Sequence, residues 1–475
     1  MTFAAALAVN AWPIFRPVLL GDDIEILVRS WTWERTLATL WEPQNEHAMP
    51  LGRLSTRGLV LLAGRPTWLP LVTALQGPIA QLAAMALLFV FVRRELNDAR
   101  MAMVATAVFG VTSLYHQAVY WFAASFSVLA LDTLLLALLA AQQWLRTSRW
   151  WWLAACAFGS MLAPAWFASG ILAGPLCACY LLFGSATESR RLQTAGSKSR
   201  VYRLDFIVPL SGTALFLVLI PSSTIQHVMH LEHYAGRAAT DAFHVGTGAW
   251  YTARSLVDNL CLGQFGVSGA RCPPWLVPFA LLLITAAAVA WWQRAPHRPL
   301  LALGLAFIFS SYLLVYSARA EWDYDVADFS TPTWGRYHLL PQLGLALFVA
   351  GGMRPGVTLD RRQLRLAAWL LVGACIVHFP RVVAQHCYRD PSARPLGIRL
   401  IDPAEQQAVL VRVEELDARC KEFSIDAETA RAALGRQTLP LCSDKENVMD
   451  LLRGGDKPRQ ISVDEARRLL DSARD

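Results

Sequence analysis

The chain has little charge for its length. Of its 475 residues, 17% are Asp, Glu, Lys or Arg, whereas 55% are hydrophobic and the mean hydropathy is +0.35. An ordinary soluble domain carries about 25% charged residues, so the composition argues against that class and favours a membrane protein. A hydrocarbon core about 30 Å thick requires about 20 helical residues per crossing, and apolar stretches of this length recur along the chain.

Several sequence signatures are missing, and each absence narrows the function. The apolar runs are rich in Leu and Ala without polar alternation, so no transmembrane strands are predicted. There is no Gly-rich phosphate loop of the nucleotide-binding kind, no Cys-pair spacing of a zinc site and no internal repeat. The net charge of +7 is dispersed over loops rather than clustered in a groove, which argues against a nucleic-acid partner.

The predicted fold class is therefore all-α, with about eleven transmembrane helices. They lie near residues 3–20, 69–92, 101–119, 125–145, 150–163, 165–184, 205–221, 274–292, 299–317, 337–353 and 366–380. The first span carries Asn10 and Arg16 and lacks the charged start and cleavage site of a signal peptide. The fifth and sixth meet at "MLAPAWFAS" almost without a loop, which fits either a helical hairpin or one broken element.

Basic loops set the orientation. Alternate loops, such as "VRRELNDAR" and "ESRRLQTAGSKSRVYR", are rich in Arg and Lys and are assigned to the cytoplasm. The N-terminus then lies in the cytoplasm of a multi-pass protein of the cytoplasmic (inner) membrane. Residues 1–380 form the transmembrane domain, and its external loops are 21–68, 222–273 and 318–336.

The remainder, residues 381–475, is predicted to be a small helical module outside the cytoplasm. Apolar residues recur at helical spacing in it, and Ser462 stands three residues before Glu465 in a capping-box pattern. External cysteines are open to oxidation, which makes Cys261 with Cys272, and Cys420 with Cys442, candidate disulfides.

The first external loop concentrates polar chemistry. It begins "GDDIEILVRSWTWERTLATLWEPQNEHAMPLGRL", where an amphipathic surface helix carries Asp22 and Asp23 at its start. Glu46 and His47 follow, and then Arg53 and Arg57. Such a loop can hold a general base and neutralise a phosphate. The alternative is that the acids cap the surface helix and the arginines face lipid headgroups.

The late segment "GRYHLLP" adds a second basic group. Arg336, Tyr337 and His338 stand at the external mouth of the tenth predicted span, where a planar guanidinium can clamp a phosphate through two hydrogen bonds. A lone Arg at a span end is otherwise an interface anchor.

With these features the chain resembles the GT-C superfamily of integral-membrane glycosyltransferases, which includes protein O-mannosyltransferases and lipid A aminoarabinose transferases. The resemblance rests on multiple spans, a large first external loop that opens with "GDD", its amphipathic helices and the late "GRYHLLP". It covers about residues 1–380 and extends to uncharacterised bacterial multi-pass membrane proteins.

The resemblance implies inverting transfer of a sugar from a polyprenyl-phosphate donor to a glycan, lipid or protein acceptor outside the cytoplasm. Asp22 or Asp23 would be the base, and Arg336 with Arg53 or Arg57 would hold the leaving phosphate. Glu46, His47, His116, Tyr337 and His338 are expected to line the cavity or contact the acceptor. No cofactor is required by the resemblance, although some members use a divalent cation held by acids.

Two further groups have both a functional and a structural interpretation. His227, His230 and His233 in "HVMHLEH" are candidate metal ligands, although a three-residue spacing drifts around a helix. Asp132 lies inside a predicted span, where an acid is expensive, and fits either a functional site or a hydrogen bond between helices.

Two other function classes remain open at the level of sequence. A transporter or flippase of lipid-linked glycans would show internal repeats and helices broken near the membrane midplane. A non-catalytic membrane scaffold would explain the C-terminal module but would leave the loop acids and arginines without a role.

Overall fold

The computed structural model describes residues 1–10, 14, 21–44, 47–64, 68–194, 205–229, 245–265, 273, 275–319, 335–353, 366 and 369–380. Of these described residues 87% are helical and none belongs to a strand, so the all-α prediction is confirmed. The predicted C-terminal module, residues 381–475, lies outside the described residues.

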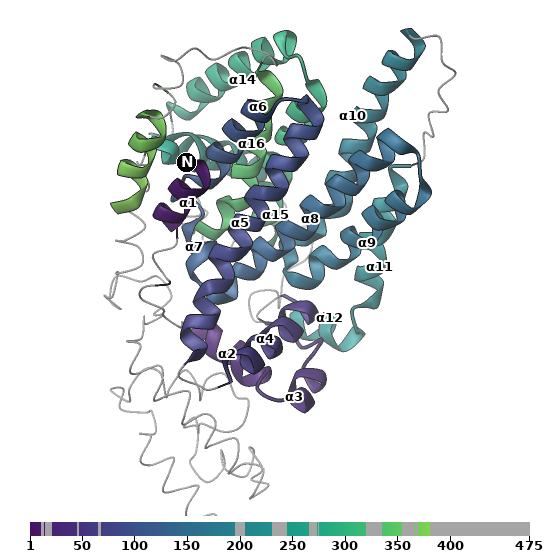
Figure 1. Ribbon diagram of the computed structural model, residues 1–475, viewed down its shortest axis with the longest axis vertical. Helices are drawn as coiled ribbons and strands as arrows, with labels where there is room; N and C mark the ends of the chain where they lie inside the picture. Colours follow the sequence, from purple (N-terminus) through teal and green to yellow (C-terminus); the bar gives the residue numbers. More distant parts are fainter. Residues whose placement is uncertain are drawn as a thin grey trace, which may run out of the picture.

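Helices occupy most of the predicted apolar runs (Figure 1), but the predicted count of about eleven spans is not confirmed: the 3–20 run is helical only over Thr2–Asn10 among the described residues. In chain order they are α1 (Thr2–Asn10), α2 (Gly21–Arg29), α3 (Trp33–Ala38), α4 (Pro50–Ala63), α5 (Leu69–Leu96), α6 (Ala99–Gly110), α7 (His116–Tyr120), α8 (Phe122–Thr147), α9 (Trp150–Trp166), η3 (Ala168–Leu172), α10 (Ala173–Thr194), α11 (Ile207–Leu219), α12 (Ser222–Met229), α13 (Val245–Arg254), η4 (Ser255–Cys261), η5 (Leu262–Phe265), α14 (Val277–Arg294), α15 (Arg298–Arg319), η6 (Gly335–His338) and α16 (Leu339–Gly352).

Four helical segments within the described residues are long and apolar enough to cross a membrane. They are Leu71–Leu96, Phe122–Thr147, Val277–Arg294 and Arg298–Ser317. Shorter apolar helices occupy Ala99–Gly110, Ala168–Gly184, Ile207–Leu219 and Trp369–Pro380. The chain thus has the make-up of a helical membrane protein, in which α5, α8, α14 and α15 are the long apolar elements.

The helices pack through small residues. α15 and α16 cross at Gly304 and Gly344, where a Cβ on either glycine would lie 2.5 Å from the carbonyl oxygen of the other. Such close backbone approach is how helices associate where hydrophobicity alone gives no preference for a neighbouring helix over lipid. α8 lies at the centre of the bundle, with 17 buried residues along its length.

The third predicted span, 101–119, is interrupted. α6 ends at Gly110, and the chain turns before α7. The carbonyl groups that the break releases are satisfied by side chains: Asn10 donates to the Gly110 oxygen (3.1 Å), and Tyr115 donates to the Phe109 oxygen (2.7 Å). Gln81 donates to the Tyr115 hydroxyl (3.0 Å) and so fixes its position. A helix end buried in an apolar bundle needs such partners because no water reaches it.

The "MLAPAWFAS" junction is a hairpin of two helices. α9 ends at Trp166, and α10 begins after the single 3-10 turn η3. A Cβ on Gly170 in η3 would lie 2.2 Å from the Ala163 carbonyl oxygen, so the turn packs directly on the last turn of α9.

Four short helices from the predicted first and second external loops gather at one end of the molecule. In Figure 1, α2, α3, α4 and α12 lie together beyond the ends of the long helices. The single amphipathic helix expected after Asp23 is divided into α2 and α3. The Thr32 side chain accepts the backbone N–H of Arg35 (3.2 Å) and starts the second helix, as Thr does at an N-cap.

Candidate functional site

Asp23 caps a helix that begins far along the chain. Its carboxylate accepts the backbone N–H of Ala123 at 2.7 Å, and the side chain is fully buried. Ala123 lies in the first turn of α8, whose own N-cap residue, Trp121, makes no side-chain cap. The negative charge of Asp23 thus sits at the positive end of the α8 dipole, where anions are stabilised.

Asp22 has a different environment. It stands in the same first turn of α2 but is partly exposed, whereas Asp23 is buried. Consecutive residues on a helix point about 100° apart, so one can turn into the core while the other faces the loops. The structure therefore distinguishes Asp22 from Asp23 by burial, whereas the sequence offered no reason to prefer either one as the base.

Arg336 reaches the same region from the other end of the chain. It lies in η6, where its guanidinium is 4.8 Å from the centroid of the Trp121 ring and 5.0 Å from that of Tyr337. Its Nη2 donates to the Tyr337 hydroxyl (3.1 Å), and its backbone N–H donates to the Gln117 side chain (3.4 Å). Arg336 thus lies beside the α8 N-terminus at which Asp23 is bound.

His47 links this arginine to the first loop. Its ring lies 4.3 Å from the ring of Phe167, centroid to centroid. Burial lowers the pKa of His47 to about 3, the positive charge of Arg336 acts in the same direction, and the negative charge of Asp22 opposes them. The charges of Arg336 and Asp22 thus both act on the His47 imidazole, which is neutral at physiological pH.

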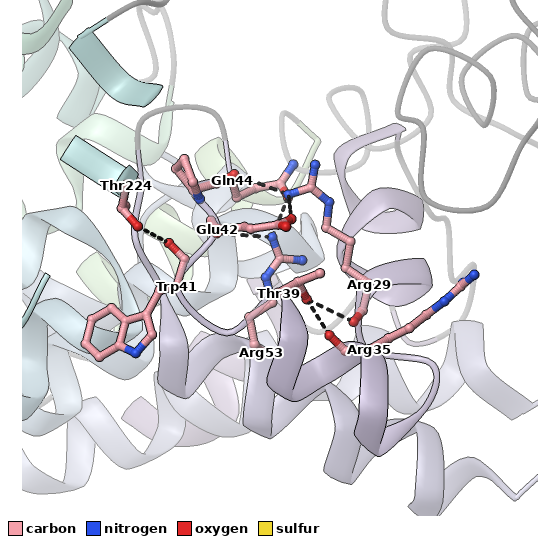
Figure 2. Close-up of polar contacts among 9 residues, drawn as sticks. Arg29, Arg35, Thr39, Trp41, Glu42, Gln44, Arg53 and Thr224 are labelled. Atoms are coloured by element: carbon pink, nitrogen blue, oxygen red, sulfur yellow. Dashed lines mark hydrogen bonds and ion pairs between the residues drawn. The ribbon is translucent and has the colours of Figure 1, made fainter. Parts of the chain in front are cut away.

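Arg53 and Arg57 bind backbone carbonyl groups of the first loop. Arg53 is fully buried, and its Nη2 donates to the Glu42 carbonyl oxygen (3.4 Å) and to the Gln44 side chain (3.5 Å). Figure 2 shows this guanidinium beneath the 41–44 segment. Arg57 donates to the Trp31 carbonyl oxygen and lies 5.7 Å from the centroid of the Trp33 ring.

The same segment is tied to its neighbours on both sides (Figure 2). Arg29 forms an ion pair with Glu42 at 3.3 Å. The Thr224 hydroxyl of α12 donates to the Trp41 carbonyl oxygen at 2.8 Å, which joins α12 to the first loop. The start of α12 therefore packs against the 41–44 segment of the first loop.

Other candidate residues lie in separate environments. His116 is fully buried, and its Nδ1 is 3.1 Å from the Asn10 side-chain oxygen near the break between α6 and α7. His338 is buried against Tyr312, with its Nδ1 3.2 Å from the tyrosine hydroxyl. Asp132 lies in the middle of α8, and its buried Oδ1 meets no hydrogen-bond partner among the described residues.

Three candidate residues fall outside the described part of the chain. They are Glu46, His230 and His233, and although the helix containing His227 is described, its side chain is not. Among the residues that are described, no three His, Cys, Asp or Glu side chains approach closely enough to hold a metal ion. Cys261 is a free thiol, and its candidate disulfide partner Cys272 lies outside the described residues.

Trp121 is a site residue that the sequence did not single out, because Trp at the end of a span is ordinarily an interface anchor. Here it is 2% exposed and lies under the Arg336 guanidinium. Its indole N–H is buried and has no acceptor among the described residues. The signal available in sequence was its place directly before the long apolar run of α8.

Comparison of the chain with protein-family models, with curated proteins and with solved structures found no match.

Proposed function

We propose that this chain is a membrane glycosyltransferase that transfers a sugar from a polyprenyl-phosphate donor to an acceptor at the extracytoplasmic face of the cytoplasmic membrane. The observation that carries the proposal is that the charges of Asp22, in α2, and Arg336, in η6, both act on His47, and that Arg336 lies over the Trp121 ring at the start of α8. The proposal includes the membrane topology predicted from the sequence, with about eleven spans and a cytoplasmic N-terminus.

The two acids have different roles in this proposal. Asp22 is the base: it takes the proton from the acceptor hydroxyl as that oxygen bonds to the sugar C1 and the bond from C1 to the phosphate oxygen breaks. Asp23 is not the base, because its carboxylate is buried and already accepts the Ala123 N–H at 2.7 Å. It holds α8, and with it Trp121, in place.

The leaving phosphate is assigned to Arg336. A positioned guanidinium stabilises the charge that develops on a leaving phosphate without reorganisation at the moment of reaction. Arg53 and Arg57 are less suited because their guanidinium groups bind loop carbonyl oxygens. Neutral His47 adds no competing positive charge beside Asp22, because its pKa is about 3.

The test is sugar transfer by the full chain in lipid nanodiscs, with polyprenyl-phosphate sugars as donors. We expect Arg336→Ala to lower kcat/KM by about 100-fold, the loss typical for removal of one charge-stabilising group. Arg298→Ala, at the exposed start of α15, is the matched control and should retain activity. Absence of transfer with every donor, or equal activity of the two variants, would refute the proposal.

The break between α6 and α7 favours a second candidate, a flippase of lipid-linked glycans, since transporters carry interrupted helices. Its weakness is that side chains of the bundle already satisfy the carbonyls at the break. Movement of a lipid-linked glycan across proteoliposomes without any new glycosidic bond would select the flippase.

A further inference from the structure

Asp132 is an acid at mid-membrane depth to which the proposed function gives no role. It stands ten residues after Phe122, the first residue of α8, and therefore about 15 Å along the helix, which is half of a hydrocarbon core about 30 Å thick. Its side chain is partly exposed, and its Oδ1 has no hydrogen-bond partner among the described residues. A carboxyl group at this depth is expensive unless another group pairs with it.

Asp132 belongs to a narrow outward stripe of α8. The rest of α8 packs against α5, α9 and α10, and 17 of its 26 residues are buried. The stripe, which we call the α8 stripe, consists of the partly or fully exposed residues Leu129, Asp132, Leu136, Leu139 and Gln143. Its members are three and four residues apart in alternation, the spacing at which one helix packs along another. Leu136, at its centre, is 54% exposed.

The outward surface of α14 shows what this protein presents to lipid. Only 6% of the α14 span is buried inside the protein, so most of this helix faces outward. From Val277 to Trp292 it contains no ionisable residue, and its most exposed side chains include Phe279, Leu282 and Leu283. The α8 stripe has similar leucines but adds an acid at its centre, which a surface that meets lipid alone does not need.

The chemistry of the α8 stripe specifies what covers it. A transmembrane helix satisfies its own backbone groups, so only its side chains need partners. A Lys or Arg near the middle of such a helix would pair with Asp132, and the leucines of the stripe would pack on its apolar residues. A second copy of this chain fits less well, because a two-fold contact through α8 would place Asp132 against its own equivalent.

We propose that the α8 stripe binds a transmembrane helix of another protein, one that carries a basic residue near its midpoint. The surface is separate from the site at Arg336, because Asp132 lies eleven residues after Trp121, about 16 Å farther along α8. The proposal therefore goes beyond sugar transfer and does not depend on it. It gives Asp132 a role in assembly and makes this chain one subunit of a membrane complex.

The test measures resonance energy transfer in phosphatidylcholine vesicles between the labelled full chain and labelled synthetic helices. The helices have about 20 Leu and Ala residues with Lys at the centre, and the control helix has Leu there instead. We expect the Lys helix to associate with the wild-type chain. Asp132→Leu should weaken this association by about 5- to 30-fold, the range for one polar contact between membrane helices. Asp132→Lys should instead favour a helix with a central Glu.

A second pair of variants tests the packing with Asp132 in place. Leu136→Trp crowds the α8 stripe one turn from Asp132 and should also weaken the association, whereas Leu283→Trp, at a 71% exposed position of α14, should retain it. Equal association of the Lys helix with wild type and Asp132→Leu, or of the Lys and Leu helices with wild type, would refute the proposal. Energy transfer between two labelled copies of the chain, lost in Asp132→Leu, would place a second copy at the stripe and overturn the assigned partner.

Discussion

The contrast between Asp22 and Asp23 gives the sharpest prediction. Asp23→Asn keeps an oxygen that can accept the Ala123 N–H but removes the charge at the α8 terminus, a charge–dipole interaction worth up to about 2 kcal/mol when it is partly buried. Asp23→Leu also leaves the buried N–H without its acceptor, which costs about 1–3 kcal/mol more. Unfolding free energy should therefore fall in the order wild type, Asp23→Asn, Asp23→Leu, by about 3 kcal/mol in total.

Asp22→Asn is the matched control, because it makes the same chemical change one residue away at a partly exposed position. We expect it to leave the thermal unfolding midpoint in detergent micelles unchanged and to lower sugar transfer by at least about 100-fold, the effect of removing a general base. Asp23→Asn should do the reverse, with a lower midpoint and with transfer retained below it. The reasoning is refuted if the two Asn variants lose stability equally, or if Asp23→Asn abolishes transfer without lowering the midpoint.

Three further predictions concern the fold around the site. The pKa of His47 is lowered from 6.5 to about 3 in the folded protein, so folding disfavours protonation of its imidazole. The stability that neutral His47 contributes above pH 6.5 is therefore lost as the pH falls toward 3. The unfolding free energy of His47→Gln, measured with a chemical denaturant, should fall less over that range, and an equal pH dependence of the two proteins would contradict the assignment. Gly77→Ala places a Cβ 1.8 Å from the Val119 carbonyl oxygen and should lower the unfolding free energy by about 1–3 kcal/mol. In Gly58→Ala the new Cβ meets no described atom within 4 Å, so helix propensity should raise the unfolding free energy by about 1 kcal/mol. Similar unfolding midpoints for the two variants would argue against the packing of α5 on α7. Asp132→Leu removes a buried carboxylate oxygen that has no partner among the described residues, so it should raise the unfolding midpoint and leave transfer intact, and a loss of transfer in a stable variant would make Asp132 functional.

The sequence by itself determined the all-helical class and the place of most long helices, because helix formation in a membrane depends on local properties. Length, apolarity and the absence of alternation fix where a segment crosses, so α8 was expected at 125–145 and extends over Phe122–Thr147. The polar residues of the first loop and of "GRYH" were also visible, since charge beside an apolar run is a local signal. The sequence could not show that the 101–119 run is broken, because two of the side chains that stabilise the break, Asn10 and Gln81, come from α1 and α5.

Only the tertiary structure decided the roles of the candidate residues. Asp23 accepts a hydrogen bond from Ala123, 100 positions away in the sequence, and Arg336 packs on Trp121 from a segment near the end of the described chain. Arg53 instead donates to a backbone carbonyl of its own loop. These contacts depend on which helix faces lie against one another, a property of the packed bundle and of no single segment. The physical reason is that a carboxylate or guanidinium acquires its chemistry from burial and from its partners, and both are long-range consequences of the fold.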